Sequence, residues 1–159
     1  MSATVVHAVF HLERQYAATP RRVFQAFADP VAKALWFAGT PDKWQLLERV
    51  MDFRVGGRER LRGKWAGGQQ TTFDAVYHDI IPEQRIIYSY DMFMDARKLS
   101  VSLATIQMQP AAGGGTHLKV SEQGAFLDGY TRMPARGNRE RGRCSTPWGH
   151  RCARLAFGS

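Results

Sequence analysis

Segments in which apolar and polar residues alternate occupy most of the chain between residues 4 and 123. A two-residue period is typical of β-strands, whose side chains point to opposite faces of a sheet. The first such segment, residues 4–16, is rich in Val, Phe, Tyr and His, and the face that begins at Val6 is the more apolar. We therefore predict an opening strand whose Val6 face packs into the core.

Two Xaa-Pro steps interrupt the alternation after this strand. Thr19 is a hydroxyl cap followed by a proline, which predicts the start of a helix with one apolar stripe. Asp29 is also followed by a proline, which predicts a second short helix ending at Trp36 or Phe37. Two short helices joined at the Asp-Pro step would form a V-shaped brace.

The rest of the alternating pattern has the spacing of β-hairpins. Six further strand segments cover residues 44–55, 58–65, 71–81, 85–93, 99–109 and 116–123, and Gly-Gly pairs or prolines separate all of them except 85–93 and 99–109. We expect the last strand to break at Gly124. Six to seven strands with two helices after the first predict an α+β fold with an antiparallel sheet. Two short helices cannot cover one face of such a sheet, so a C-terminal helix is expected to complete the cover.

Five segments between residues 8 and 129 share their pattern with a known family. They are A-T-P-R-R-V-F-Q-A-F-A-D-P from residue 18, D-F-R-V-G-G-R-E from residue 52, I-P-E-Q-R-I-I-Y-S-Y-D-M from residue 81, L-S-V-S-L-A-T from residue 99 and G-G-T-H-L-K-V-S-E-Q-G-A-F-L-D-G from residue 114. By these segments the chain resembles the START/Bet v 1-like (SRPBCC) superfamily, in its branch related to the activator of Hsp90 ATPase.

The resemblance implies a helix-grip fold, in which a curved antiparallel sheet wraps around a long C-terminal helix and an apolar cavity lies between them. Relatives in this superfamily bind hydrophobic small molecules, stimulate the ATPase of a chaperone or cyclise polyketides. A fold by itself does not select one of these functions.

The formal net charge of +8 is concentrated near the C-terminus. Residues 1–129 hold 15 Lys and Arg against 13 Asp and Glu, whereas residues 130–159 hold seven Arg and one acid. Clustered arginines can neutralise phosphates, but the segment lacks interleaved aromatic residues and any recognisable motif, so we predict no nucleic-acid partner. Cys144, His150 and Cys152 lack the fourth ligand and the spacing of a zinc site, so no metal and no other cofactor is predicted.

The segment 131–159 does not carry the pattern of the expected grip helix. It has two prolines and four glycines, which disfavour a helix interior by about 3 and about 1 kcal/mol each. We divide the chain into a START/Bet v 1-like domain, residues 1–130, and an atypical Arg/Gly/Pro-rich tail, residues 131–159, with the grip helix missing or disrupted. Another reading frame of the segment recovers an amphipathic helix, so we hypothesise a frameshift. Sheet surface exposed by the lost helix predicts a homodimer or aggregation.

Glu122 is the candidate for chemistry, because the strand pattern places it on the apolar face with Leu118 and Val120. Burial there would raise the pKa of its carboxyl group, which suits acid–base work. The alternative is a strand-end glutamate that pairs with an arginine or caps backbone amides at Gly124. Four charged residues beside the Gly56-Gly57 turn are interpreted as a solvated rim, namely Asp52, Arg54, Arg58 and Glu59.

Bulky residues of the sheet and helices form the predicted ligand-binding surface. They are Trp36, Phe37, Trp44, Phe73, Tyr77, Tyr88, Tyr90, Met92 and Phe126. Each of them can also be an ordinary core residue, but aromatic side chains with a few polar groups are how an apolar ligand pocket is lined. We predict binding of a hydrophobic small molecule between sheet and helices. The alternatives are a polyketide cyclase-like or hydrolase-like enzyme, with Glu122 as base and Tyr88 or Tyr90 as donor, and a co-chaperone that activates the Hsp90 ATPase.

Several other classes of protein are disfavoured by the sequence. No run approaches the ~20 apolar residues of a membrane span and the N-terminus lacks a secretion signal, so we expect a cytoplasmic protein without a membrane partner. No Ser/His/Asp motif, phosphate-binding loop or dinucleotide fingerprint occurs, so a binding protein is favoured over an enzyme, with catalysis left open.

Overall fold

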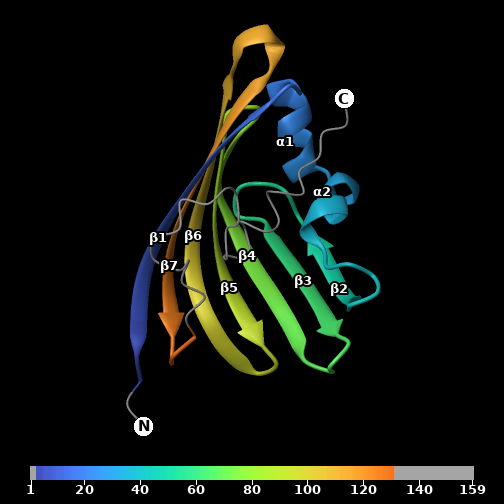
Figure 1. Ribbon diagram of the computed structural model, residues 1–159, viewed down its shortest axis with the longest axis vertical. Helices are drawn as coiled ribbons and strands as arrows, with labels where there is room; N and C mark the ends of the chain where they lie inside the picture. Colours follow the sequence, from blue (N-terminus) through green and yellow to red (C-terminus); the bar gives the residue numbers. More distant parts are fainter. Residues whose placement is uncertain (1–2, 131–159) are drawn as a thin grey trace.

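A single antiparallel sheet of seven strands dominates the computed structural model, which describes residues 3–130. The elements in chain order are β1 Val5–Tyr16, α1 Pro20–Ala28, α2 Pro30–Phe37, β2 Trp44–Met51, β3 Arg58–Trp65, β4 Gln70–Ile81, β5 Arg85–Met94, β6 Arg97–Pro110, the 3-10 turn η1 Ala112–Gly114 and β7 Thr116–Leu127. The strands lie in the order β1-β7-β6-β5-β4-β3-β2 (Figure 1). The chain thus crosses from β1 to the far edge at β2 and returns by successive hairpins until β7 pairs with β1.

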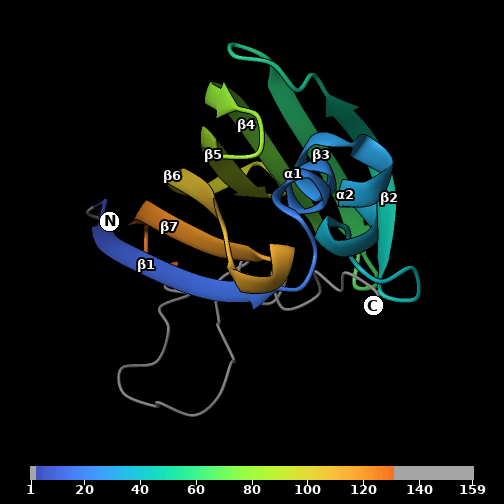
Figure 2. The same ribbon diagram turned by 90° about the horizontal axis from the view of Figure 1, so that it is seen from above.

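The sheet is strongly curved, and both helices lie on its concave side (Figure 2), with α2 beside β2 and β3 and α1 nearer β6. This arrangement confirms the predicted α+β class and the Bet v 1-like sheet with two short helices after the first strand. The predicted absence of the grip helix, the frameshift hypothesis and the tail division all concern residues 131–159, which lie outside the described residues.

The two helices begin where the proline steps predict. The hydroxyl of Thr19 accepts a hydrogen bond from the backbone N–H of Arg22 at 3.3 Å and caps α1. Asp29 caps α2 with one carboxylate oxygen, which accepts from the N–H groups of Val31 and Ala32 at 2.8 and 2.9 Å. The indole of Trp36 on α2 donates to a backbone carbonyl of α1 at 2.9 Å. These contacts hold the two helices as one brace.

The hydrophobic core lies between the helical brace and the concave face of the sheet. Its members alternate along the strands with residues of the outer face, as the two-residue period requires. Its large buried apolar side chains are Leu12, Phe24, Phe27, Trp36, Phe37, Trp44, Leu61, Phe73, Tyr77, Ile86, Tyr88, Tyr90, Ile106, Met108 and Leu118. On β1 the face that begins at Val6 is the more buried one, which confirms the predicted orientation of that strand.

The predicted end of the last strand at Gly124 is wrong. β7 continues to Leu127, and Gly124 is paired with both β1 and β6. A Cβ at Gly124 would lie 3.0 Å from the Ser102 hydroxyl and 3.0 Å from the Phe126 ring, so glycine is needed there for close packing and not for a turn. The chain turns instead at Asp128 and Gly129, which both have positive φ angles.

The helices α1 and α2 are both short. Neither helix of residues 3–130 is long and apolar enough to cross a membrane.

Candidate functional site

A row of aromatic side chains crosses the concave face of the sheet. Tyr77 on β4 contacts Tyr88 on β5 with ring centroids 5.8 Å apart, and Tyr88 lies 6.0 Å from Tyr90 on the same strand. Phe73 packs 4.9 Å from Tyr90 and 5.0 Å from Phe37, which connects the row to α2. All five side chains are buried. The sequence predicted these five as ligand-binding residues, and the fold brings them together.

The other four predicted residues lie around this row. Trp36 is buried in the α1–α2 brace, and Trp44 is buried against β3, where a Cβ on Gly63 would come within 1.8 Å of its indole. Met92 is half-buried at the edge of the core, and Phe126 lies near the end of β7. The part of these residues in binding a ligand stays a prediction.

Glu122 lies on the concave face of β7 and is 5% exposed. One of its oxygens, Oε1, accepts a hydrogen bond from the hydroxyl of Tyr90. The second oxygen, Oε2, and the nearby hydroxyl of Ser102 are both buried without a regular hydrogen bond in the part of the chain that the structure describes. The strand-end interpretation does not hold, because β7 continues past Gly124 and the partner of Glu122 is a tyrosine.

Burial raises the pKa of Glu122 above that of an ordinary carboxyl group. The hydrogen bond from Tyr90 opposes this increase, and so does the nearby Ser102 hydroxyl, although that pair does not reach regular hydrogen-bond geometry. Burial also raises the pKa of Tyr88, with further contributions from Tyr90 and Glu122. Tyr88 therefore stays neutral, while Glu122 can exchange a proton closer to neutral pH than an exposed carboxylate.

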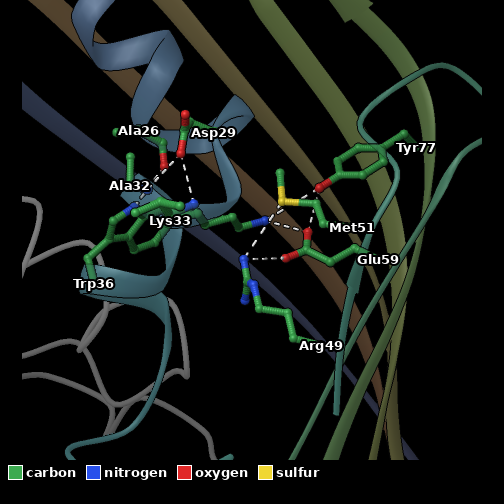
Figure 3. A network of polar contacts seen from close by, with 10 residues as sticks. Ala26, Asp29, Ala32, Lys33, Trp36, Arg49, Met51, Glu59 and Tyr77 are labelled. Atoms are coloured by element: carbon green, nitrogen blue, oxygen red, sulfur yellow. Dashed lines mark hydrogen bonds and ion pairs between the residues drawn. The ribbon is translucent and has the colours of Figure 1, made fainter.

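A second buried polar cluster lies at the β2–β3 end of the same face (Figure 3). Lys33 on α2 forms an ion pair with Glu59 on β3, with 2.5 Å between Nζ and Oε2. The hydroxyl of Tyr77 donates a hydrogen bond to the same oxygen. Arg49 on β2 lies on the other side of Glu59, with 3.6 Å between Nη2 and Oε1. Burial is the main cause that raises the pKa of Tyr77, followed by the charge of Glu59.

The interpretation of Glu59 as part of a solvated rim is wrong, and this cluster was not predicted from the sequence. Asp52 and Arg54 do form an exposed ion pair at the turn, but Glu59 is fully buried. Two features of the sequence could have predicted that Lys33 and Glu59 are buried. Glu59 has the same strand parity as the buried Leu61, and Lys33 lies three and four residues before two aromatic core residues, which puts it on the apolar stripe of its helix.

The acidic and histidine side chains of residues 3–130 are dispersed over the structure. No group of three or more His, Asp or Glu side chains within residues 3–130 is arranged to hold a metal ion.

The family described as Activator of Hsp90 ATPase homolog 1-like protein matches residues 17–156. The match therefore extends beyond residue 130 into the segment for which we hypothesise a frameshift. No curated protein matches the chain.

Solved structures similar to the chain come from several bacteria. The Mll3558 protein from Rhizobium loti is 42% identical with a TM-score of 0.73, over 79% of this chain and 84% of that protein. An uncharacterised protein from Rhizobium leguminosarum is 40% identical with a TM-score of 0.77, over 82% and 85% of the two chains. The CV1439 protein from Chromobacterium violaceum is 28% identical with a TM-score of 0.64, over 92% and 93%.

Proposed function

Because the chain belongs to the family described as Activator of Hsp90 ATPase homolog 1-like protein, whose SRPBCC superfamily often binds hydrophobic ligands, we propose that it binds an apolar small molecule at the concave face. The ligand lies along the aromatic row of Phe73, Tyr88 and Tyr90. A polar group of the ligand donates a hydrogen bond to Glu122. Large aromatic surfaces with one or two placed polar groups are characteristic of such sites.

The observation that carries this proposal is the unfilled hydrogen-bonding capacity at the β6–β7 end of the row. Glu122 Oε2 and Ser102 Oγ are buried and without regular partners among the described residues. Leaving a buried acceptor unsatisfied costs about 1–3 kcal/mol, and more for a charged group. A ligand hydroxyl placed between them would recover this cost and would orient the apolar part of the ligand toward Tyr90.

The proposal is tested with a matched pair of ligands, 1-dodecanol and dodecyl methyl ether, titrated into the full-length chain and followed by tryptophan fluorescence. They share an apolar tail, but only the alcohol can donate a hydrogen bond. We expect the chain to bind the alcohol about tenfold more tightly, the equivalent of about 1.4 kcal/mol. In Glu122→Leu the two ligands should bind equally.

The control variant is Glu13→Leu, which removes an exposed carboxylate on β1 and should keep the preference for the alcohol. Failure of both ligands to bind the wild-type chain would show that the proposed function is wrong. Equal binding of both ligands by the wild-type chain would show that Glu122 accepts no hydrogen bond from the ligand.

Proton transfer on a bound polyketide is the second candidate, and the raised pKa of Glu122 favours it. The Glu122 carboxylate would accept a proton from a carbon between two carbonyl groups, and Tyr88 would donate a hydrogen bond to the enolate oxygen, since the hydroxyl of Tyr90 already donates to Glu122. A Glu122→Gln variant that binds a poly-β-ketone thioester but no longer consumes it would support this function. Equal consumption by the variant and the wild type would exclude it.

The family description suggests a third candidate, activation of a chaperone ATPase. It would be supported by faster ATP hydrolysis when the full-length chain is added to an Hsp90-type chaperone. An unchanged rate at saturating chain would count against it.

A further inference from the structure

The buried cluster at the β2–β3 end of the concave face has more positive than negative charge. It contains two cations, Lys33 and Arg49, and one acid, Glu59. The Lys33 and Glu59 side chains are at most 2% exposed, and that of Arg49 is 13% exposed. We propose that Arg49 binds the acidic group of the ligand, so that the ligand is an amphiphilic carboxylic acid. This inference rests on the proposed function and names its ligand class.

Within residues 3–130, the guanidinium of Arg49 lacks the acceptors that such a group normally finds when it is buried. Its Nε and Nη1 atoms are buried without a hydrogen-bond partner in the described part of the chain. Among the described residues, its Nη2 atom has only the weakly accepting sulfur of Met51 at 3.7 Å and, beyond hydrogen-bond length, Glu59 Oε1 at 3.6 Å. Guanidinium N–H groups form a planar fork that matches the two oxygens of a carboxylate.

Glu59 cannot neutralise both cations. Its Oε2 atom already accepts from Lys33 and from Tyr77, and the shorter ion pair is the one with Lys33. Arg49 therefore supplies the positive charge that the described side chains leave uncompensated. In a buried setting an uncompensated charge is costly, and a bound anion removes that cost.

The size of the charge excess favours a carboxylate over a phosphate monoester. Two cations and one acid leave a single positive charge, which one carboxylate balances, whereas a phosphate monoester carries about −1.5 to −2 at neutral pH. The surroundings are apolar as well: Tyr77 contacts Phe53 at 5.0 Å and Tyr88 at 5.8 Å, so the aromatic row begins at the cluster. An acid group at Arg49 thus places an apolar chain along the row toward Tyr90 and Glu122.

The test compares dodecanoate with 1-dodecanol at pH 8 by isothermal titration calorimetry on the full-length chain, below the concentration at which either probe aggregates. The wild-type chain should bind dodecanoate at least tenfold more tightly than the alcohol. Arg49→Gln should lose this preference while its affinity for the alcohol stays within about twofold. Arg49→Lys keeps the charge without the fork and should show an intermediate preference. Arg54→Gln, which removes an exposed arginine, should behave as the wild type.

Several outcomes would overturn the inference. Equal affinity for both probes, unchanged in Arg49→Gln, would show that Arg49 binds no acid while the proposed function stands. A merely structural role for Arg49 would weaken both probes equally in Arg49→Gln. If that variant does not fold, Arg49→Lys decides, because an unreduced preference for dodecanoate in it would exclude recognition by the guanidinium fork. Failure of both probes with the wild type would refute the proposed function itself.

Discussion

The buried ion pair between Lys33 and Glu59 gives a prediction whose magnitude follows from the structure. Replacing Lys33 by Met removes the cation that lies 2.5 Å from the Glu59 carboxylate. Removal of one partner from a buried pair typically costs about 3–5 kcal/mol, because the other charge stays buried without compensation. Arg49 remains 3.6 Å from the second carboxylate oxygen, so the loss should lie near the lower end, about 3 kcal/mol. That is roughly a hundredfold change in the unfolding equilibrium constant.

The free energy of unfolding is measured by urea titration with circular dichroism, for Lys33→Met, Glu59→Gln and the double variant. Because the second substitution removes the charge that the first leaves unpaired, the double variant should lose at least about 2 kcal/mol less than the sum of the single variants. The exposed pair of Asp52 and Arg54 provides the control, and its removal should cost no more than about 1 kcal/mol.

Additive losses in the double variant, within about 0.5 kcal/mol, would refute the assigned pairing of Lys33 with Glu59. A Lys33→Met variant as stable as the wild type would show that α2 does not depend on this contact with β3.

Three further predictions concern single positions. Protonation of Glu122 stabilises the fold below the usual carboxyl pKa, and this contribution is lost as pH rises through its raised folded-state pKa. In Glu122→Gln the free energy of unfolding, measured by urea titration, should therefore fall less above pH 4.5, and the variant should be more stable than the wild type at pH 7. Parallel pH profiles of the two chains would contradict this. Gly63→Ala should lower stability by about 1–3 kcal/mol, since its Cβ would overlap the Trp44 ring; thermal unfolding is the measure, and Gly67→Ala, which meets no atom within 4 Å, is the control. Asp29→Ala should cost about 1 kcal/mol in urea unfolding by uncapping α2, and a loss below about 0.3 kcal/mol would exclude the capping role.

The sequence predicts the strands well because their signal is local. Alternation and turn residues fix where a strand runs and which face is apolar, so β3 is predicted without error and most other ends differ by one to four residues. The error at Gly124 has a physical origin. Glycine is required both by turns and by close approach inside a sheet, and only the contacts with Ser102 and Phe126 distinguish the two cases.

Only the part of the candidate site that depends on the local strand pattern was predicted from the sequence. The parity of β7 places Glu122 on the buried face, but its partner Tyr90 is 32 residues away. The Lys33–Glu59 contact joins a helix to a strand 26 residues later. Charged residues usually lie in solvent, so single-residue preferences argue against a buried pair, and only the packing of α2 on the sheet brings the two charges together.

The most direct test of the central claim is to locate a bound apolar molecule on the two faces of the sheet. A diazirine-bearing 1-dodecanol is photolysed in complex with the full-length chain, and the labelled residues are identified by tandem mass spectrometry. Adjacent residues of a strand point to opposite faces, so single-residue assignment separates the sites. We predict label on Phe73, Tyr88 and Tyr90. Label on Val101 and Leu103, which line an apolar groove of about 420 Å³ on the outer face, would contradict binding at the concave face.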